Sequence, residues 1–286
     1  MKENENYKSW RKKLWSFGLK ICFWGFGASQ IYLFLRLHVF TSCIIPTSSM
    51  CPTILPGDYV YASLYSEESK KKKVKRNDIV IFHYPYTYGM ERIEKTYKLF
   101  YCKRCVALPG DFFHIDSTGI YRIKGMEDTV FIGNRCAQLT IGKQQVNFDS
   151  IYIPKVGDEI QLNKSNYHLY KKYIEFESNS YLSFKNDTVY MDGKKIKRYK
   201  FTQNYYYMAG DNVAASYDSR YWGLVPEELL LGKAIFIWYS KDKESGKVRW
   251  ERLFKRLSNS FNQTIPSIHQ ASEATENQVN ANDSNR

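Results

Sequence analysis

Hydrophobic and polar positions divide the chain into an apolar N-terminal stretch and a long, strand-like remainder. The best continuous apolar window, residues 21–35, has Gln30 as its only strongly polar member. A helix needs roughly 20 residues to span a bilayer, and long basic side chains can snorkel at its ends. Lys20 and Arg36 lie at such positions, so the pattern predicts a membrane-spanning helix over residues 17–37.

Flanking charges predict how this helix is oriented. Residues 1–13 carry five basic side chains, which places them in the cytoplasm by the positive-inside rule. Arg36 and His38 on the far side partly oppose that rule. A cleaved signal peptide is the alternative, but it needs a shorter apolar core and an Ala-x-Ala-like cut site. Neither is present, which favours an uncleaved anchor with the rest of the chain on the outer side.

After residue 40 the pattern is typical of a mostly β protein. Runs of alternating or continuously apolar residues are bounded by Gly, Pro, Asn and Asp. An Asp-Gly pair between two such runs is a strong hairpin signal. The predicted elements are strands over residues 58–65, 78–82, 105–108 and 232–239, an aromatic strand beginning at Tyr205, a hairpin at Asp192-Gly193, a short helix over residues 167–177 and a helical turn over residues 227–231.

Composition narrows the kind of partner. The 286 residues allow one or two domains, and 43% hydrophobic residues suffice for a core. A net charge of +13 suits nucleic acid or an anionic membrane surface. The basic residues are scattered and no nucleic-acid-binding motif accompanies them, which favours the membrane. The 24 tyrosines agree with a β-rich fold.

The cysteines do not indicate a metal site. Only Cys102 and Cys105 are closely spaced, and no second CxxC or CxxH follows them. In a strand, positions three apart face opposite sides, which argues against a disulfide between them. We expect mostly free thiols and no metal.

A serine between two prolines is the first candidate for chemistry. Ser49 precedes Met50 and lies between Pro46 and Pro52, which stiffen the backbone and present the hydroxyl on an extended segment. An ordinary turn after a membrane helix has a similar composition.

A lysine in a strand-like run is the second candidate. Lys103 precedes the apolar residues 105–108 and a Pro-Gly turn. It is either an exposed strand residue or a lysine desolvated by apolar neighbours. Burial lowers the pKa of lysine, and a neutral amine is a competent general base for a serine hydroxyl.

The third candidate is a loop dense in polar residues, after the aromatic strand. Such a loop contains Asp211, Asp218 and Arg220. Charged groups are costly to bury unpaired, so an ion pair among them is expected.

In this order, and after one apolar segment, the three stretches resemble bacterial type I signal peptidase (leader peptidase), a family of Ser-Lys serine endopeptidases. Its serine motif, S-x-S-M-x-P-T-L, resembles residues 47–54, TSSMCPTI. The lysine motif, K-R-V-V-G-L-P-G-D, resembles residues 103–111, KRCVALPGD. Its third motif, G-D-N-R-x-x-S-x-D-S-R, resembles residues 210–220, GDNVAASYDSR. The similarity covers roughly residues 14–256. Val213 replaces the arginine of the third motif, and Cys51 follows Met50 where other residues are usual.

Residue roles follow from the resemblance. It implies Ser49 as nucleophile and Lys103 as general base, with the Ser49 N–H and the Thr47 hydroxyl as oxyanion hole. Ser216 would orient Lys103, while Asp218, Arg220 and Asp211 would support the loop. The substrate-pocket candidates are Ile45, Met50, Ile54, Tyr101 and Cys102. No cofactor or metal is implied.

The resemblance also implies an antiparallel β-sheet catalytic core with an inserted β-rich subdomain. The expected divisions are a cytoplasmic N-terminus over residues 1–16, a transmembrane anchor over 17–40, a catalytic core over 41–115 and 201–256, the insertion over 116–200 and a disordered polar tail over 257–286.

The implied function is removal of signal peptides from exported preproteins, after small residues, at the outer face of the bacterial plasma membrane. The implied partners are preproteins and the lipid bilayer, with no nucleic acid and a monomeric chain. One alternative is a specialised single-substrate or self-cleaving Ser-Lys peptidase. Another is an inactive membrane-tethered binding module, against which the presence of both Ser49 and Lys103 argues.

Overall fold

A computed structural model describes most of the chain. The residues described are 2–38, 40–65, 74–86, 92–94, 99–115, 120–123, 131–132, 138–141, 144–147, 151–212 and 215–257. Two features discussed above lie outside them: Val213 and all of the polar tail except its first residue. The basic residues 70–73 and Cys136 also lie outside the described residues.

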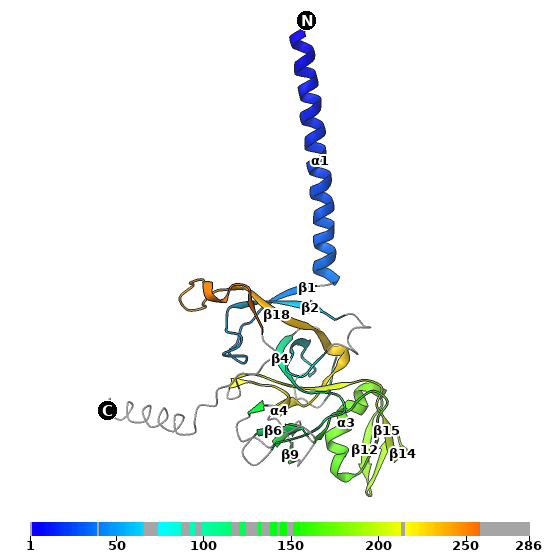
Figure 1. Cartoon of the computed structure of the whole chain (residues 1–286). Helices are drawn as coiled ribbons and strands as arrows, with labels where there is room; N and C mark the ends of the chain where they lie inside the picture. Colours follow the sequence, from blue (N-terminus) through cyan, green and yellow to red (C-terminus); the bar gives the residue numbers. More distant parts are fainter. Residues whose placement is uncertain are drawn as a thin grey trace, which may run out of the picture.

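The N-terminal segment forms one long helix, α1 (Lys2–His38), which projects from a β-rich body (Figure 1). Its helical structure was expected over residues 17–37. In the part of the chain that the structure describes, no helix is both long and apolar enough to cross a membrane. The predicted transmembrane anchor is corrected accordingly: the segment is a helix, but Lys20 and Gln30 interrupt its apolar run.

A curled antiparallel sheet forms the body next to α1. Among the described residues it has eight strands, in the order β1-β2-β18-β3-β4-β16-β17, with β19 paired to β18. Strand β18 pairs with β2, β3 and β19, and its register shifts bend the sheet. The strands are β1 (Phe40–Ile44), β2 (Asp58–Leu64), β3 (Ile79–His83), β4 (Phe100–Ala107), β16 (Tyr205–Ala209), β17 (Val225–Pro226), β18 (Leu230–Ser240) and β19 (Lys255–Arg256).

This sheet confirms the strand predictions. Alternation over residues 58–65 becomes β2, with Val60 and Ala62 buried on one face. The continuous apolar run over residues 78–82 becomes β3, which is buried throughout because the sheet is covered on both sides there. The strand and helical turn expected over 232–239 and 227–231 appear as β18 and the 3₁₀ turn η2 (Glu227–Leu229).

Between β4 and β16 the chain forms smaller sheets and one helix. The helix α3 (Lys164–Ser178) confirms the prediction over residues 167–177, and Asn163 caps it by accepting hydrogen bonds from two backbone N–H groups. The predicted hairpin joins β13 to β14, with positive φ angles at Asp192 and Gly193. The strands here are β5 (Phe112–Ile115), β6 (Ile120–Ile123), β7 (Phe131–Ile132), β8 (Gln138–Ile141), β9 (Gln144–Asn147), β10 (Ile151–Tyr152), β11 (Glu159–Gln161), β12 (Leu182–Lys185), β13 (Thr188–Met191), β14 (Lys194–Ile196) and β15 (Arg198–Lys200).

Two apolar clusters hold these parts together. The larger one joins the central sheet to the insertion, with Phe82, Tyr173 and Tyr207 among its fully buried side chains. The smaller one lies under the loop between β1 and β2 and includes Met50 and Ile54. Helix α3 therefore packs on the central sheet, so the region between β4 and β16 contributes to the core.

A buried lysine lies at this packed boundary. Lys172 on α3 donates a hydrogen bond to the carbonyl oxygen of Trp222 at 2.6 Å, and its amine lies 4.6 Å from the centre of the Tyr86 ring. Only 3% of the residue is exposed. Burial lowers the pKa of Lys172 to about 7.

This pKa predicts a stability that increases with pH. Between pH 7 and about pH 10 the unfolded chain keeps the Lys172 proton, which the folded chain has lost. Because the unfolded state binds more protons, the free energy of unfolding contributed by this group rises by up to about 1.4 kcal/mol per pH unit. We expect Lys172→Met to remove that rise.

Urea unfolding at pH 7.0, 7.75 and 8.5 tests this expectation, with Lys171→Met as the matched control because the Lys171 side chain is 33% exposed. The quantity compared is the difference between each variant and the wild type, since all share the other titrating groups. Parallel pH curves for Lys172→Met and wild type would contradict the assigned shift.

Candidate active site

Three segments far apart in sequence meet at one edge of the central sheet. Strand β4 pairs with β16, with Cys105 opposite Met208 and Arg104 opposite Ala209. The chain leaving β16 therefore runs beside Lys103. The loop of residues 45–57 that joins β1 to β2, called the serine loop below, reaches the same place, where the Asn212 N–H donates to the Ser49 carbonyl at 3.0 Å.

Ser49 and Lys103 lie within hydrogen-bond distance of each other. The Lys103 amine donates to the Ser49 hydroxyl oxygen at 2.6 Å. Ser49 is 7% exposed and Lys103 3% exposed, so Lys103 is not an exposed strand lysine. Burial lowers the pKa of Lys103, an effect that the nearby Asp218 carboxylate partly opposes. This lower pKa increases the fraction of neutral amine that can accept a proton from Ser49.

Thr47 lies beside the same hydroxyl. Its side-chain oxygen is 3.4 Å from the Ser49 hydroxyl oxygen, and the residue itself is exposed. A small hydroxyl side chain is thus available at the solvent side of Ser49, where a substrate carbonyl can approach. This position agrees with the oxyanion-hole role that the resemblance implies, which stays a prediction.

A buried carboxylate organises the third segment. Asp218 pairs with Arg220 at 2.7 Å, as expected, and accepts hydrogen bonds from the Gly210 N–H at 2.9 Å and the Ser216 hydroxyl at 2.6 Å. Asp218 also caps the short helix α4 (Ser219–Trp222). Within the described residues no hydrogen bond joins Ser216 to Lys103. The expected contact between Ser216 and the Lys103 amine is therefore not formed, because the Ser216 hydroxyl donates to Asp218 instead.

Gly210 makes this close packing possible. A Cβ atom there would lie 2.1 Å from the Ser216 hydroxyl oxygen and 2.5 Å from the Ser49 carbonyl oxygen. Neither distance is compatible with a side chain, so only glycine lets the third segment approach the serine loop this closely.

Asp211 belongs to a different ion pair from the one expected. Its carboxylate accepts two hydrogen bonds from Arg104, at 2.6 and 2.7 Å, and one from the Thr53 hydroxyl at 2.5 Å. The side chains of Arg104 and Asp211 are each 1% exposed. Neither Arg104 nor Thr53 had an expected role, although both lie inside the serine and lysine motifs. The available signal was strand alternation, which points Arg104 to the face opposite Lys103.

The structure divides the pocket candidates into buried and partly exposed residues. Met50 and Ile54 are fully buried and Ile45 is 5% exposed, all in the smaller apolar cluster. These three pack in the cluster beneath the serine loop, and their part in a substrate pocket stays a prediction. Tyr101 and Cys102 are partly exposed, and Tyr101 stacks on Tyr84 at 4.8 Å between ring centres.

Two further observations concern possible metal ligands and the cysteines near the site. Within the described ranges no group of His, Cys, Asp and Glu side chains is placed to hold a metal ion. Cys51, next to Met50, and Cys102, next to Lys103, are both free thiols.

A buried serine hydroxyl hydrogen-bonded to a buried lysine, on a mostly β domain, is typical of a serine hydrolase. Comparison with known protein families identifies the kind of serine hydrolase. The family model described as signal peptidase, peptidase S26, matches residues 19–239. The chain belongs to this family and is a serine peptidase.

Individual relatives agree. The chain is 30% identical over 261 residues to signal peptidase I of Buchnera aphidicola subsp. Schizaphis graminum, covering 81% of this chain and 78% of that protein. It is 29% identical over 228 residues to signal peptidase I of Aquifex aeolicus, covering 73% and 79%. It is 26% identical over 289 residues to signal peptidase I of Rickettsia typhi, covering 88% and 96%.

Proposed function

We propose that this chain removes N-terminal signal peptides from exported preproteins, with Ser49 as nucleophile and Lys103 as general base. The observation that carries the proposal is the 2.6 Å contact between the buried Lys103 amine and the Ser49 hydroxyl in a member of this peptidase family. An amine with a lowered pKa beside a hydroxyl is a recurrent way to activate a serine.

In the first half-reaction neutral Lys103 takes the Ser49 proton as the hydroxyl oxygen attacks the carbonyl carbon of the scissile bond. Collapse of the tetrahedral intermediate breaks the C–N bond, and the leaving amine of the mature protein takes the proton from Lys103. The signal peptide stays attached to Ser49 as an ester. Water, deprotonated by Lys103, then attacks the ester carbonyl. The bond to the Ser49 oxygen breaks, that oxygen takes the proton back from Lys103, and the signal peptide leaves with a free carboxylate.

The surrounding residues take supporting roles in this proposal. The Ser49 N–H and the Thr47 hydroxyl donate to the oxyanion of the intermediate, a contribution worth about 3 kcal/mol per donor in comparable sites. Asp218, held by Arg220 and Ser216, keeps Gly210 against the serine loop. Tyr101 and Cys102, the partly exposed candidates, line the path of small substrate side chains.

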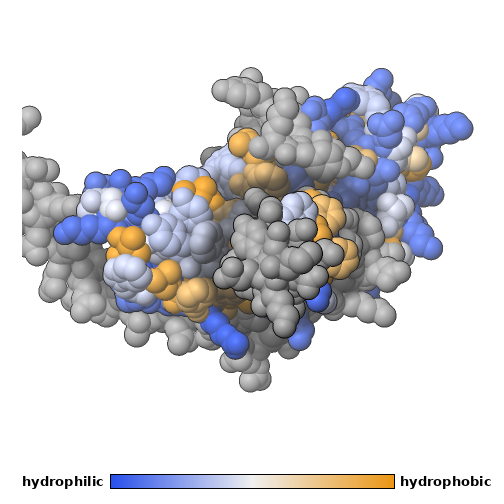
Figure 2. Space-filling view, turned by 90° about the horizontal axis from the view of Figure 1, so that it is seen from above, coloured by the Kyte–Doolittle hydropathy of each residue, from blue (hydrophilic) through white to orange (hydrophobic). Residues whose placement is uncertain are grey.

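We also propose that α1 attaches the peptidase to the bacterial plasma membrane. Aromatic side chains of α1 are widely exposed, with Trp15 71%, Phe23 74% and Trp24 74% accessible. Figure 2, which looks down on the body from the side of α1, shows apolar side chains beside hydrophilic ones. Exposed aromatic residues favour a membrane interface.

Cleavage of a purified preprotein by the full chain in detergent tests the proposed function. One substrate carries alanine at the first and third positions before the cut, and a matched substrate carries phenylalanine at both. We expect one cut, after the alanine, and a rate for the phenylalanine substrate lower by at least about 100-fold, because bulky side chains do not fit pockets for small ones.

Mass spectrometry of both products locates the cut. Cleavage of both substrates at equal rates, or at scattered bonds in a mature protein, would indicate a general peptidase. No cleavage of either substrate would refute the proposed function.

A further inference from the structure

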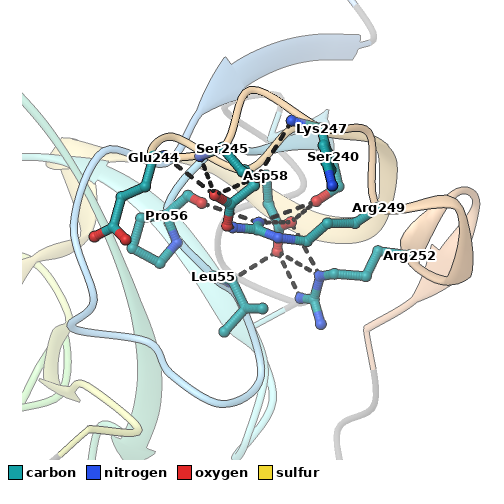
Figure 3. A network of polar contacts seen from close by, with 10 residues as sticks. Leu55, Pro56, Asp58, Ser240, Glu244, Ser245, Lys247, Arg249 and Arg252 are labelled. Carbon is teal, nitrogen blue, oxygen red and sulfur yellow. Dashed lines mark hydrogen bonds and ion pairs between the residues drawn. The ribbon is translucent and has the colours of Figure 1, made fainter.

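The segment that follows β18 folds back over the serine loop. Residues 240–257, called the C-terminal segment below, contain the short helical turn η3 (Trp250–Arg252) and strand β19. Figure 3 shows its side chains converging on Asp58 at the end of the serine loop. No sequence motif described above includes this basic stretch, and the proposed reaction uses none of its residues.

Asp58 is the centre of the contact. Its carboxylate is fully buried and accepts hydrogen bonds from the Leu55 N–H at 2.8 Å and the Ser240 hydroxyl at 2.6 Å. The Arg252 guanidinium donates to both oxygens of the Asp58 carboxylate, from one nitrogen at 2.5 Å and from another at 3.0 Å. A buried carboxylate needs such a partner, so the positions of Asp58 and Arg252 are fixed together.

The same segment also holds backbone carbonyls on both sides of Ser49. Lys243 donates to the Pro46 carbonyl at 2.7 Å, three residues before Ser49. Arg252 donates to the Thr53 carbonyl at 3.0 Å, four residues after it. Arg249 donates to the Pro56 carbonyl at 3.0 Å. The serine loop is irregular, so its carbonyls lack the backbone N–H partners that a helix or strand would supply. These three carbonyls accept hydrogen bonds from basic side chains instead.

The backbones themselves are in close contact. The Lys241 N–H donates to the Gly57 carbonyl at 3.0 Å. A Cβ atom on Gly57 would lie 1.9 Å from the Lys241 carbonyl oxygen, and the φ angle of Gly57 is +89°. Only glycine permits this approach, so the loop and the C-terminal segment are fitted to one another along several residues.

We propose that Arg252 is a positioning residue for the reaction at Ser49, acting through Asp58 and the Thr53 carbonyl to hold the serine loop against Lys103. This inference rests on the proposed function. Met50 and Ile54 pack the serine loop on the smaller apolar cluster, and the C-terminal segment adds polar contacts to the same loop through Arg252. Removing Arg252 loosens the loop and lengthens the Ser49–Lys103 contact.

The expected effect is on the chemical step. A displacement of about 1 Å in a reacting group can cost about 100-fold in rate. We expect Arg252→Met to lower kcat for preprotein cleavage by about 10- to 100-fold and to leave KM within about twofold. Arg252→Lys keeps a positive charge near Asp58, so its kcat should fall less than that of Arg252→Met. Arg256→Met, an exposed arginine four residues away, is the matched control and should behave as wild type.

A second measurement does not depend on activity. Hydrogen exchange of the full chain in detergent reports whether the backbone amides of residues 47–57 are protected, with peptides of α3 as the internal reference. We expect faster exchange in the serine loop of Arg252→Met, most at Leu55, whose N–H is bonded to Asp58. Exchange in α3 should stay as in wild type, because a globally destabilised chain would exchange faster in both places.

The two measurements separate the outcomes. Faster loop exchange together with a lower kcat and an unchanged KM supports the inference, and Arg252→Lys gives the same test if Arg252→Met does not fold. Unchanged loop exchange, or faster exchange with wild-type kcat, overturns it. If wild type does not cleave the preprotein, the proposed function fails, and the exchange result alone shows whether Arg252 holds the loop.

Discussion

Ser49→Ala and Lys103→Met are each expected to lower kcat/KM for preprotein cleavage by about 10⁴- to 10⁶-fold, the range found when one member of a nucleophile–base unit is removed. The two losses should not add in the double variant, because either change alone prevents attack by an activated serine. Lys103→Arg should be as inactive as Lys103→Met, since a guanidinium stays protonated and cannot accept the Ser49 proton.

A pH–rate profile distinguishes the role of Lys103 as base from a role in folding. Burial lowers the pKa of Lys103, so kcat/KM should rise with pH as the free enzyme loses this proton, with a midpoint below the ordinary lysine value of about 10.4. The direction follows from the chemistry: only the neutral amine is a base.

Lys172→Met is the matched control for Lys103→Met in the cleavage assay, because it also replaces a buried lysine by an apolar side chain of similar length. It should retain cleavage within about tenfold of wild type. Wild-type cleavage by Ser49→Ala would refute the nucleophile assignment. A Lys103→Met variant that cleaves, or a profile that is flat from pH 6 to pH 9, would refute the assignment of Lys103.

Local patterns predicted much of the fold. Period-two alternation located β2, continuous apolar residues located β3, and Asp192-Gly193 located the hairpin between β13 and β14. Each of these signals depends on residues close in sequence, which is why it needs no tertiary information. The prediction of a spanning helix was wrong because it allowed Lys20 to snorkel and tolerated Gln30, and the two residues together interrupt the apolar run of α1.

The site was predicted in its chemistry and only partly in its geometry. Ser49 and Lys103 are 54 residues apart, and nothing in composition or spacing brings them within 2.6 Å; the resemblance carried that expectation. Asp211 was expected to support the same loop as Asp218 and Arg220, because all three lie in it. Its actual partner, Arg104, is on a neighbouring strand and follows from the pairing of β4 with β16, which the sequence does not reveal.

Lys172, Asp58 and Arg252 were missed for a common reason. Each is a charged residue that sequence patterns assign to the surface, and each is buried because a segment distant in sequence covers it. The contact that covers Lys172 comes from Trp222, and the one that covers Asp58 comes from Arg252, 194 residues further along the chain. Long-range burial of this kind is set by topology, so no local pattern predicts it.

The ion pair between Arg104 and Asp211 links the catalytic segments from beneath. Arg104 follows Lys103 on β4, Asp211 follows Gly210, and the Thr53 hydroxyl adds the serine loop to the same carboxylate. The Arg104 guanidinium also donates to the Asn77 carbonyl at 2.7 Å. All three segments of the candidate site therefore meet at one buried pair, so we expect a change there to affect both stability and the alignment of Ser49 with Lys103.

Asp211→Asn is expected to lower the free energy of unfolding by about 3–5 kcal/mol, because it leaves the Arg104 charge buried without its counter-ion. Glu159→Gln, which breaks the exposed pair with Arg198, is the control and should cost less than about 1 kcal/mol. The double variant Arg104→Met with Asp211→Leu removes both charges and should recover most of the lost stability, since paired apolar replacements of a buried ion pair are often neutral. Urea unfolding at pH 7 measures the free energy of unfolding of the wild type, the two single variants and the double variant. A cost for Asp211→Asn no larger than for Glu159→Gln would show that the buried pair does not hold the three segments together.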